Sequence, residues 1–277
     1  MLPVFEAFIL SGPPEVFMAG MLPDIGITYP ELLFHIFCEV IALKQDVESA
    51  LAAELSAIFF AGVPPSQAEA WLMRYTNELW KALQRASPAG MLKRAILYCF
   101  GVMLWYNPIG FLKCCGEIGC SAQVFEIWLC SVELIESLQE KKALALGLIQ
   151  VFMLASSDQL HASIAAGLPH VIRQLADQTA KISKLRLKEA SDECEEDDDD
   201  EEDDFAGDGD PDTCYRNSAV FRCCTPLRSL DELHILQQAL QSAPPPMVQQ
   251  IRSWLGEEGL SKWGNELQSS RQLREKK

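Results

Sequence analysis

Three groups of residues in this 277-residue sequence have side chains that could do chemistry: ten cysteines, four histidines and one dense run of carboxylates. The histidines are His35, His161, His170 and His234, and no two of them have the spacing of metal ligands. None of them pairs with a cysteine in a zinc-binding pattern. We therefore predict that the histidines are ordinary surface or interface residues and that the chain has no metal site.

The cysteines include no C-x-x-C pair, and the chain contains no N-x-S/T glycosylation triplet. Cys114, Cys115 and Cys120 form the densest group, but their spacing matches no redox or metal motif. Apolar neighbours such as Phe111 and Leu112 favour simple packing, in which a thiol behaves as a small hydrophobe. We therefore expect free thiols in a reducing compartment, the cytosol or the nucleus.

Motifs of the common enzyme classes are absent from the sequence. It has no G-x-S-x-G, no P-loop, no Rossmann glycine pattern and no H-E-x-x-H. We therefore predict that the protein is not an enzyme and needs no cofactor.

The carboxylate run extends from Asp192 to Asp212 and contains 15 Asp and Glu residues without a single Lys or Arg. Because the whole chain has 39 acidic and 23 basic residues, removing this run leaves 24 acidic residues against 23 basic ones. A nearly neutral remainder offers no broad basic surface for phosphates, so direct nucleic-acid binding is not expected.

Closely spaced carboxylates repel one another, so we expect the run to be a disordered loop. Without fixed geometry it would hold Ca²⁺ or Mg²⁺ only weakly. Two interpretations remain. The run is either a solubilising linker or a segment that attracts a Lys/Arg-rich protein electrostatically. On the second interpretation, the predicted cargo-binding residues are Glu195, Glu196, Asp197, Asp198, Asp199, Asp200, Glu201, Glu202, Asp203 and Asp204.

The elements that position these groups have helical periodicity throughout, which predicts an all-α fold. The expected helices cover residues 30–43, 47–61, 66–86, 89–106, 108–116, 122–138, 141–155, 158–166, 169–188, 229–241 and 247–255. The apolar stripe of the third one consists of Ala68, Trp71, Leu72, Tyr75, Leu79, Ala82 and Leu83.

Helix ends are predicted from local signals. Ser66–Glu69 and Ser229–Glu232 have the capping-box pattern, and Gly62 is placed for a left-handed C-terminal cap. Asn107 and Pro108 supply an N-cap and a first-turn proline. This pair also interrupts the uncharged stretch Ala95–Leu112, so we interpret that stretch as a buried helix ending at Tyr106 and predict no membrane insertion.

Helices of about 15 residues alternate with short turns, and antiparallel pairs begin near Pro30, Ser66 and Ser121. This spacing is typical of HEAT-type helix pairs, which stack into a solenoid. A compact helical bundle is the competing architecture. We predict three parts: HEAT-like repeats over residues 1–191, the acidic loop over 192–212, and a short helical tail over 213–277, where packing against the solenoid is the favoured role of Trp254 and Trp263.

Three stretches of the sequence resemble the C-terminal part of a nuclear import receptor of the importin-β (karyopherin-β) family, in its importin-seven and importin-eight branch. They are LPVFEAFILSGPPEVFMAGMLPDI at the start, AILYCFGVMLWYNP followed by KKALALGLIQVF, and DELHILQQALQSAPPPMVQQIRSWLGEEGL after the acidic run. The combination covers nearly the whole chain in the expected order.

The resemblance implies a fragment of a longer receptor that carries basic protein cargo from cytoplasm to nucleus through the nuclear pore. It implies binding to Phe-Gly nucleoporins and to the Ran GTPase, although the family's main Ran-binding repeats have no counterpart here. No catalytic residue transfers from the family. The alternative is an acidic helical adaptor or histone-chaperone-like scaffold for basic proteins, which would not cross the pore.

Overall fold

A computed structural model describes residue 9 and residues 12–43, 45–135, 137–160, 162–192 and 226–274. These residues are almost entirely helical, which confirms the all-α class. They also contain one small antiparallel hairpin that no sequence pattern predicted, formed by β1 (Met21–Leu22) and β2 (Ile27–Thr28). Strands of two residues are too short to show an alternation of apolar and polar side chains.

Long helices provide most of the structure, and their bounds match the predicted segments closely in the first half of the chain. In chain order the helical elements are α2 (Pro14–Ala19), α3 (Tyr29–Ala42), α4 (Asp46–Gly62), α5 (Pro65–Arg85), α6 (Met91–Tyr106), α7 (Pro108–Ile118), α8 (Ser121–Cys130), η1 (Val132–Leu134), α9 (Leu138–Ser156), α10 (Ala162–Ala165), α11 (Leu168–Asp192), η2 (Pro226–Ser229), α14 (Glu232–Ser242) and α15 (Pro245–Arg274).

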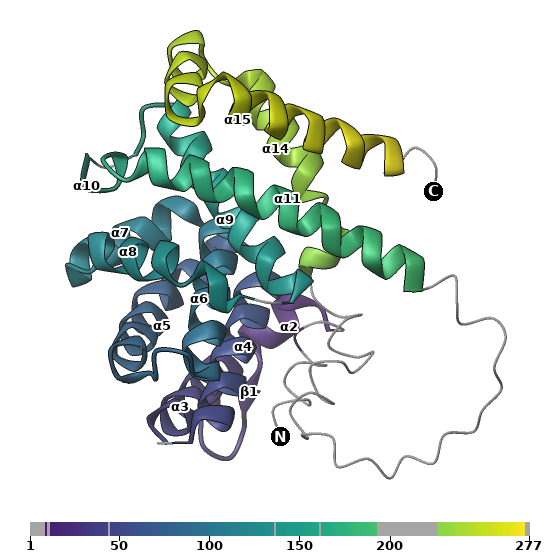
Figure 1. Ribbon diagram of the computed structural model, residues 1–277. Helices are drawn as coiled ribbons and strands as arrows, with labels where there is room; N and C mark the ends of the chain where they lie inside the picture. Colours follow the sequence, from purple (N-terminus) through teal and green to yellow (C-terminus); the bar gives the residue numbers. More distant parts are fainter. Residues whose placement is uncertain are drawn as a thin grey trace, which may run out of the picture.

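The helices follow one another in chain order from α3 at one end of the molecule to α15 at the other (Figure 1). The helices α4, α6 and α9 pack side by side, and α14 packs on α9, so these four form one layer. A second layer contains α3, α5, α7 and α8, and α11 packs on α9 and on α15. Consecutive hairpins therefore contact mainly the next hairpin along the chain.

The layer made by α4, α6 and α9 is buried nearly all round. Every residue of α6 from Ala95 to Leu104 is buried, and α9 is buried continuously from Lys141 to Ile149. Helices that are apolar on every face need partners on every face. Part of this cover comes from η2, which packs on both α4 and α9 and whose Leu227 is fully buried.

The predicted break in the apolar stretch Ala95–Leu112 is confirmed. Helix α6 ends at Tyr106, and the Asn107 side chain accepts a hydrogen bond from the Gly110 N–H at 3.0 Å while Pro108 starts α7. Within the described residues, none of the helices combines the length and the apolar character needed to cross a bilayer.

The other three predicted caps are wrong. Helix α4 ends because Val63 precedes a proline and is extended at φ −101°, so Gly62 is simply the last helical residue. Helix α5 begins at Pro65, which favours the first helical position and leaves Ser66 inside the first turn. Asp231, rather than Ser229, caps α14 by accepting a hydrogen bond from the His234 N–H at 3.1 Å.

The single helix predicted over residues 122–138 is also wrong, because two elements occupy this stretch. Helix α8 ends at Cys130, and a 3₁₀ turn leads to α9. A capping box at Ser137 and Glu140 starts α9, with the Ser137 hydroxyl accepting from the Glu140 N–H at 3.2 Å and the Glu140 carboxylate accepting from the Ser137 N–H at 3.1 Å. This reciprocal bonding starts a new helix at Leu138, the residue where the predicted helix was expected to end.

Candidate functional site: the base of the acidic segment

The predicted cargo-binding residues Glu195 to Asp204 lie outside the described residues. The structure does describe the helical elements that precede and follow this stretch of the chain. Helix α11 ends at Asp192 and η2 begins at Pro226 (Figure 1). The candidate site is therefore built from the side chains that hold these two ends.

A group of four charged side chains, two of them buried and two partly exposed, joins the helices on the two sides of the acidic segment. We call Lys142, Arg186, Asp231 and Glu232 the anchor cluster. Arg186 Nη2 lies 2.6 Å from Glu232 Oε1, and Arg186 Nη1 lies 3.8 Å from Asp231 Oδ1. Lys142 Nζ lies 3.7 Å from Glu232 Oε2. The cluster therefore links α9 and α11, which precede the segment, to α14, which follows it.

Local folding places each member of the cluster. Asp231 caps α14 and Glu232 occupies its first turn, where a negative charge is favoured by the helix dipole. The fully buried Leu227 fixes η2 against α4 and α9 just before them. Both carboxylates are thus held by backbone geometry before any cation approaches.

Burial dominates the electrostatics of the anchor cluster. Glu232 is completely buried, and the Lys142 side chain is 6% exposed. Desolvation lowers the pKa of Lys142, and Arg186 lowers it further, while Glu232 and Asp231 act in the opposite direction. Within the cluster two cations face two carboxylates, so its own charges balance.

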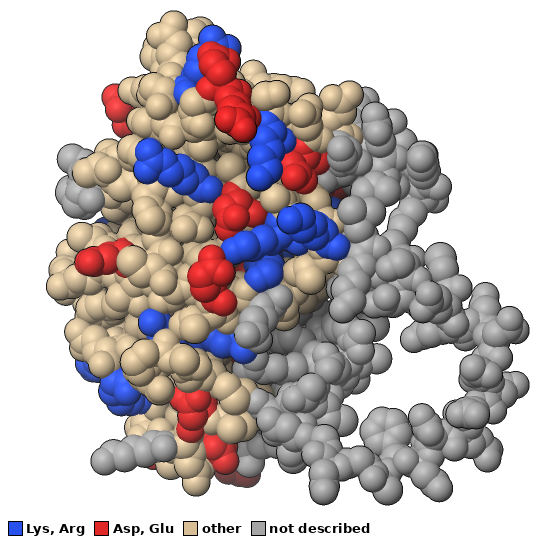
Figure 2. Space-filling view, in the orientation of Figure 1, with Lys and Arg blue, Asp and Glu red and all other residues tan. Residues whose placement is uncertain are grey.

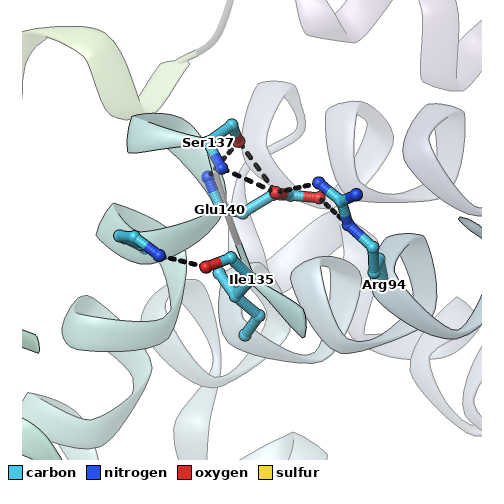
Figure 3. Close-up of polar contacts among 5 residues, drawn as sticks. Arg94, Ile135, Ser137 and Glu140 are labelled. Carbon is cyan, nitrogen blue, oxygen red and sulfur yellow. Dashed lines mark hydrogen bonds and ion pairs between the residues drawn. The ribbon is translucent and has the colours of Figure 1, made fainter. Parts of the chain in front are cut away.

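A second polar network joins α6 to α9 (Figure 3). Arg94 Nη2 donates to Glu140 Oε2 at 2.9 Å, and Glu140 also belongs to the Ser137 capping box. Burial alone would raise the pKa of Glu140, but the hydrogen bonds and charge of Arg94, together with Ser137, lower it overall. Beside it, Lys141 Nζ donates to the Ile135 carbonyl (Figure 3). These contacts stabilise the start of α9.

The Phe-Gly binding that the family resemblance implies would need apolar grooves between helices, for which the seams among α3, α5 and α7 are candidates. At the α3–α5 seam the Arg74 guanidinium lies 4.2 Å from the Phe34 ring centre and 4.7 Å from that of Trp71, so the cation covers this apolar surface. At the α5–α7 seam Gly110 packs close to Leu72, and the neighbouring Ile109 is 63% exposed. The second seam therefore presents an open apolar side chain.

Figure 2 shows basic and acidic side chains interspersed on the face seen in Figure 1. Lys181 of α11, for example, pairs with Glu133 at 3.0 Å and with Asp177 at 2.9 Å. Pairing of this kind agrees with the nearly neutral composition of the chain outside the acidic run.

The remaining predicted groups have ordinary surroundings. His35, His170 and His234 are exposed, as predicted, and His161 lies outside the described residues. Across the part of the chain that the structure describes, no group of three or more His, Cys, Asp or Glu side chains could hold a metal ion. Cys115 and Cys120, however, are joined by a hydrogen bond between their side chains, which their spacing in the sequence did not predict.

The tryptophans of the C-terminal helix pack as predicted. Trp263 is 3% exposed, and its Nε1 donates to the Thr179 hydroxyl of α11 at 3.3 Å. The Trp254 carbonyl accepts from Arg173 at 3.3 Å. Between them Gly256, at φ 72° and ψ 170°, bends α15, which lets both halves of the helix lie against the body.

Comparison with known proteins identified no relative. No family model, curated protein or solved structure matches this chain. Function is therefore inferred from the sequence patterns together with the geometry and charge of the described residues.

Proposed function

We propose that this chain is a protein-binding scaffold of the nuclear import receptor type, part of a longer receptor, which captures basic protein cargo through its acidic segment. The supporting observation is the anchor cluster, which joins α9 and α11, before the run of 15 carboxylates, to the start of α14, after it. The sequence resemblance to the importin-β family supports the transport role.

The architecture that goes with this proposal is a HEAT-like solenoid. Its support is the order of packing, in which α4, α6, α9 and α14 form one row and each hairpin rests mainly on the next. A solenoid of this kind bends easily and can adapt to cargo of different shapes. Transport would also involve shuttling between cytoplasm and nucleus, contacts with Phe-Gly nucleoporins, and cargo release by Ran acting mainly on repeats beyond this chain.

The acidic segment would act through long-range attraction. A concentrated negative charge raises the rate at which a Lys/Arg-rich protein is captured, and dissolved salt screens the attraction over about 10 Å at 0.1 M. Within the anchor cluster two cations face two carboxylates, and the carboxylates of the acidic run are the ones proposed to bind a basic partner.

The first prediction concerns this attraction. Changing the ten residues from Glu195 to Asp204 to Gln and Asn should weaken binding to a Lys/Arg-rich protein at least tenfold at 50 mM salt and remove most of its salt dependence. Fluorescence titration at 50 and 300 mM salt measures both effects. Melting temperature should stay nearly constant, because the anchor cluster is unchanged.

A matched control keeps the composition and scrambles the order of the same ten residues. This variant should bind as the natural chain does, since charge rather than sequence is recognised. Unchanged affinity of the neutral variant at low salt would contradict the proposal.

The adaptor alternative is favoured by a specific observation. The layer of α4, α6 and α9 is buried nearly all round, and Arg74 covers the apolar α3–α5 seam. The α3–α5 seam is then not open to Phe-Gly repeats, which leaves the α5–α7 seam at Ile109 as the candidate. An acidic adaptor needs no such surface.

Binding to immobilised Phe-Gly repeats separates the two functions. A transport receptor should be retained, and Ile109→Asp at the α5–α7 seam should reduce retention at least fivefold while folding is preserved, because this side chain is 63% exposed. Met153→Asp is the control, as Met153 is 43% exposed and lies on α9. A chain that passes through the column unretained would support the adaptor instead.

A further inference from the structure

Two buried cysteines face each other where α7 ends and α8 begins. The Cys120 N–H donates to the Cys115 carbonyl at 2.9 Å, and the Gly119 N–H donates to the Gly116 carbonyl at 3.1 Å. Gly119 between them is left-handed at φ 78°. These features define a Schellman motif, in which the residues at the positions of Cys115 and Cys120 normally contact each other through their side chains.

In this protein the contacting side chains are two thiols. The Cys120 side chain does not cap α8, and it is instead hydrogen-bonded to the Cys115 thiol. A disulfide bridges Cα separations of roughly 4.4–6.8 Å, and here a direct hydrogen bond between the backbones of the two residues holds them close together. Cys114, the adjacent residue, is not part of this hydrogen bond.

We propose that Cys115 and Cys120 form a redox-sensitive pair that hydrogen peroxide converts into an intrachain disulfide. In the first step the Cys120 thiolate attacks peroxide, giving a sulfenic acid on Cys120 and hydroxide. In the second step the Cys115 thiol attacks that sulfur, and the S–S bond forms as water leaves. Overall two thiols and one peroxide give one disulfide and two waters.

The order of the two steps follows from the hydrogen bond. The hydrogen bond between the two thiols lowers the pKa of Cys120 against the opposing effect of burial, and together with burial it raises the pKa of Cys115. Cys120 is thus the attacking thiol and Cys115 the resolving one. Both residues are at most 1% exposed, but Gly116, Glu117 and Gly119 above them are exposed, so a small oxidant reaches the pair by local opening of this cap.

Peptide mapping tests the pair directly. After peroxide treatment and alkylation under denaturing conditions, a protease that cuts after glutamate separates the two cysteines at Glu117. We expect a reducible cross-linked peptide containing Cys115 and Cys120 in more than half of the molecules. The exposed Cys130 should still be mostly alkylated at that point.

Variants assign the roles. Cys114→Ser should keep the cross-link, while Cys115→Ser and Cys120→Ser should lose it. A sulfenic-acid trap should label Cys120 in Cys115→Ser several times more strongly than it labels Cys115 in Cys120→Ser. Circular dichroism checks that each variant is folded. Because the peptide that ends at Glu117 also contains Cys99 and Cys114, fragmentation of the linked peptide from the natural chain must place the bond on Cys115, and this decides the matter even if one variant is not folded. Oxidation of Cys130 while Cys115 and Cys120 stay fully alkylated would overturn the proposal.

Discussion

Replacing Gly101 with alanine should lower the free energy of unfolding by about 2–3 kcal/mol, the upper part of the range for overpacked sites. Gly101 lies where α6 and α9 approach most closely. A Cβ at this position would lie 2.8 Å from the Ala143 carbonyl oxygen and 2.9 Å from its carbon. These are backbone atoms, so they cannot rotate away, and α9 as a whole must shift. The higher helix propensity of alanine offsets only about 1 kcal/mol.

A second glycine of the same chain provides the matched control. Gly116 lies in α7, and a Cβ there would have no other heavy atom within 4 Å. Gly116→Ala should therefore stabilise the protein by about 0.5–1 kcal/mol, the intrinsic helix preference alone. Urea denaturation of both variants measures the difference. If Gly101→Ala is as stable as Gly116→Ala, the close approach of α6 and α9 is wrong.

Glu232→Gln should cost about 3 kcal/mol or more of stability, because it removes a buried carboxylate that two cations approach, and breaking a buried ion pair is strongly destabilising. Lys142 and Arg186 both approach this carboxylate, at 3.7 Å and 2.6 Å, and Glu232 is completely buried. The loss of stability should be largest in α14, where amide hydrogen exchange should accelerate more than in α4 or α6. Thermal unfolding and hydrogen exchange together locate the effect.

Two comparisons distinguish the effect of a buried ion pair from that of a solvent-exposed ion pair. Glu78→Gln removes the partner of Lys81 in a pair that is 54% and 30% exposed, and it should change stability by less than about 0.5 kcal/mol. Combining Lys142→Met with Glu232→Gln should recover part of the loss, since a well-packed apolar side chain no longer needs a counter-charge. Equal costs for Glu232→Gln and Glu78→Gln would contradict the role of the anchor cluster.

Helix interiors were predictable from the sequence because the apolar period is a local property. In α5 every member of the predicted stripe is buried except Trp71, which lies at the seam under Arg74. Caps were less predictable because the same S-x-x-E pattern occurs at residues 66–69 and 137–140, and only the second forms a capping box. Pro64 and Pro65 decide the first case by starting the helix one residue before the serine.

The anchor cluster could not be predicted, because its members are far apart in the sequence and meet only when α9, α11 and α14 pack together. The one local signal was the pair Lys141 and Lys142 at the start of the apolar helix α9. Lysines in such a position indicate buried cations that need partners. The Cys115–Cys120 contact had a clearer signal, since Gly119 directly before Cys120 marks the left-handed position of a helix end. The spacing of the cysteines does not indicate the contact unless Gly119 is considered together with it.

The order in which the helices pack also has a kinetic consequence. Contacts from α2 to α9 join segments that are near one another in the chain, whereas α14 and α15 must return across the acidic segment to reach α9 and α11. Local contacts form early because little chain has to be closed, and distant ones form late. Helices α14 and α15 should therefore dock after the helices that precede them have folded. A nascent or partly unfolded chain would expose α14 and α15 to proteases before any other described helix.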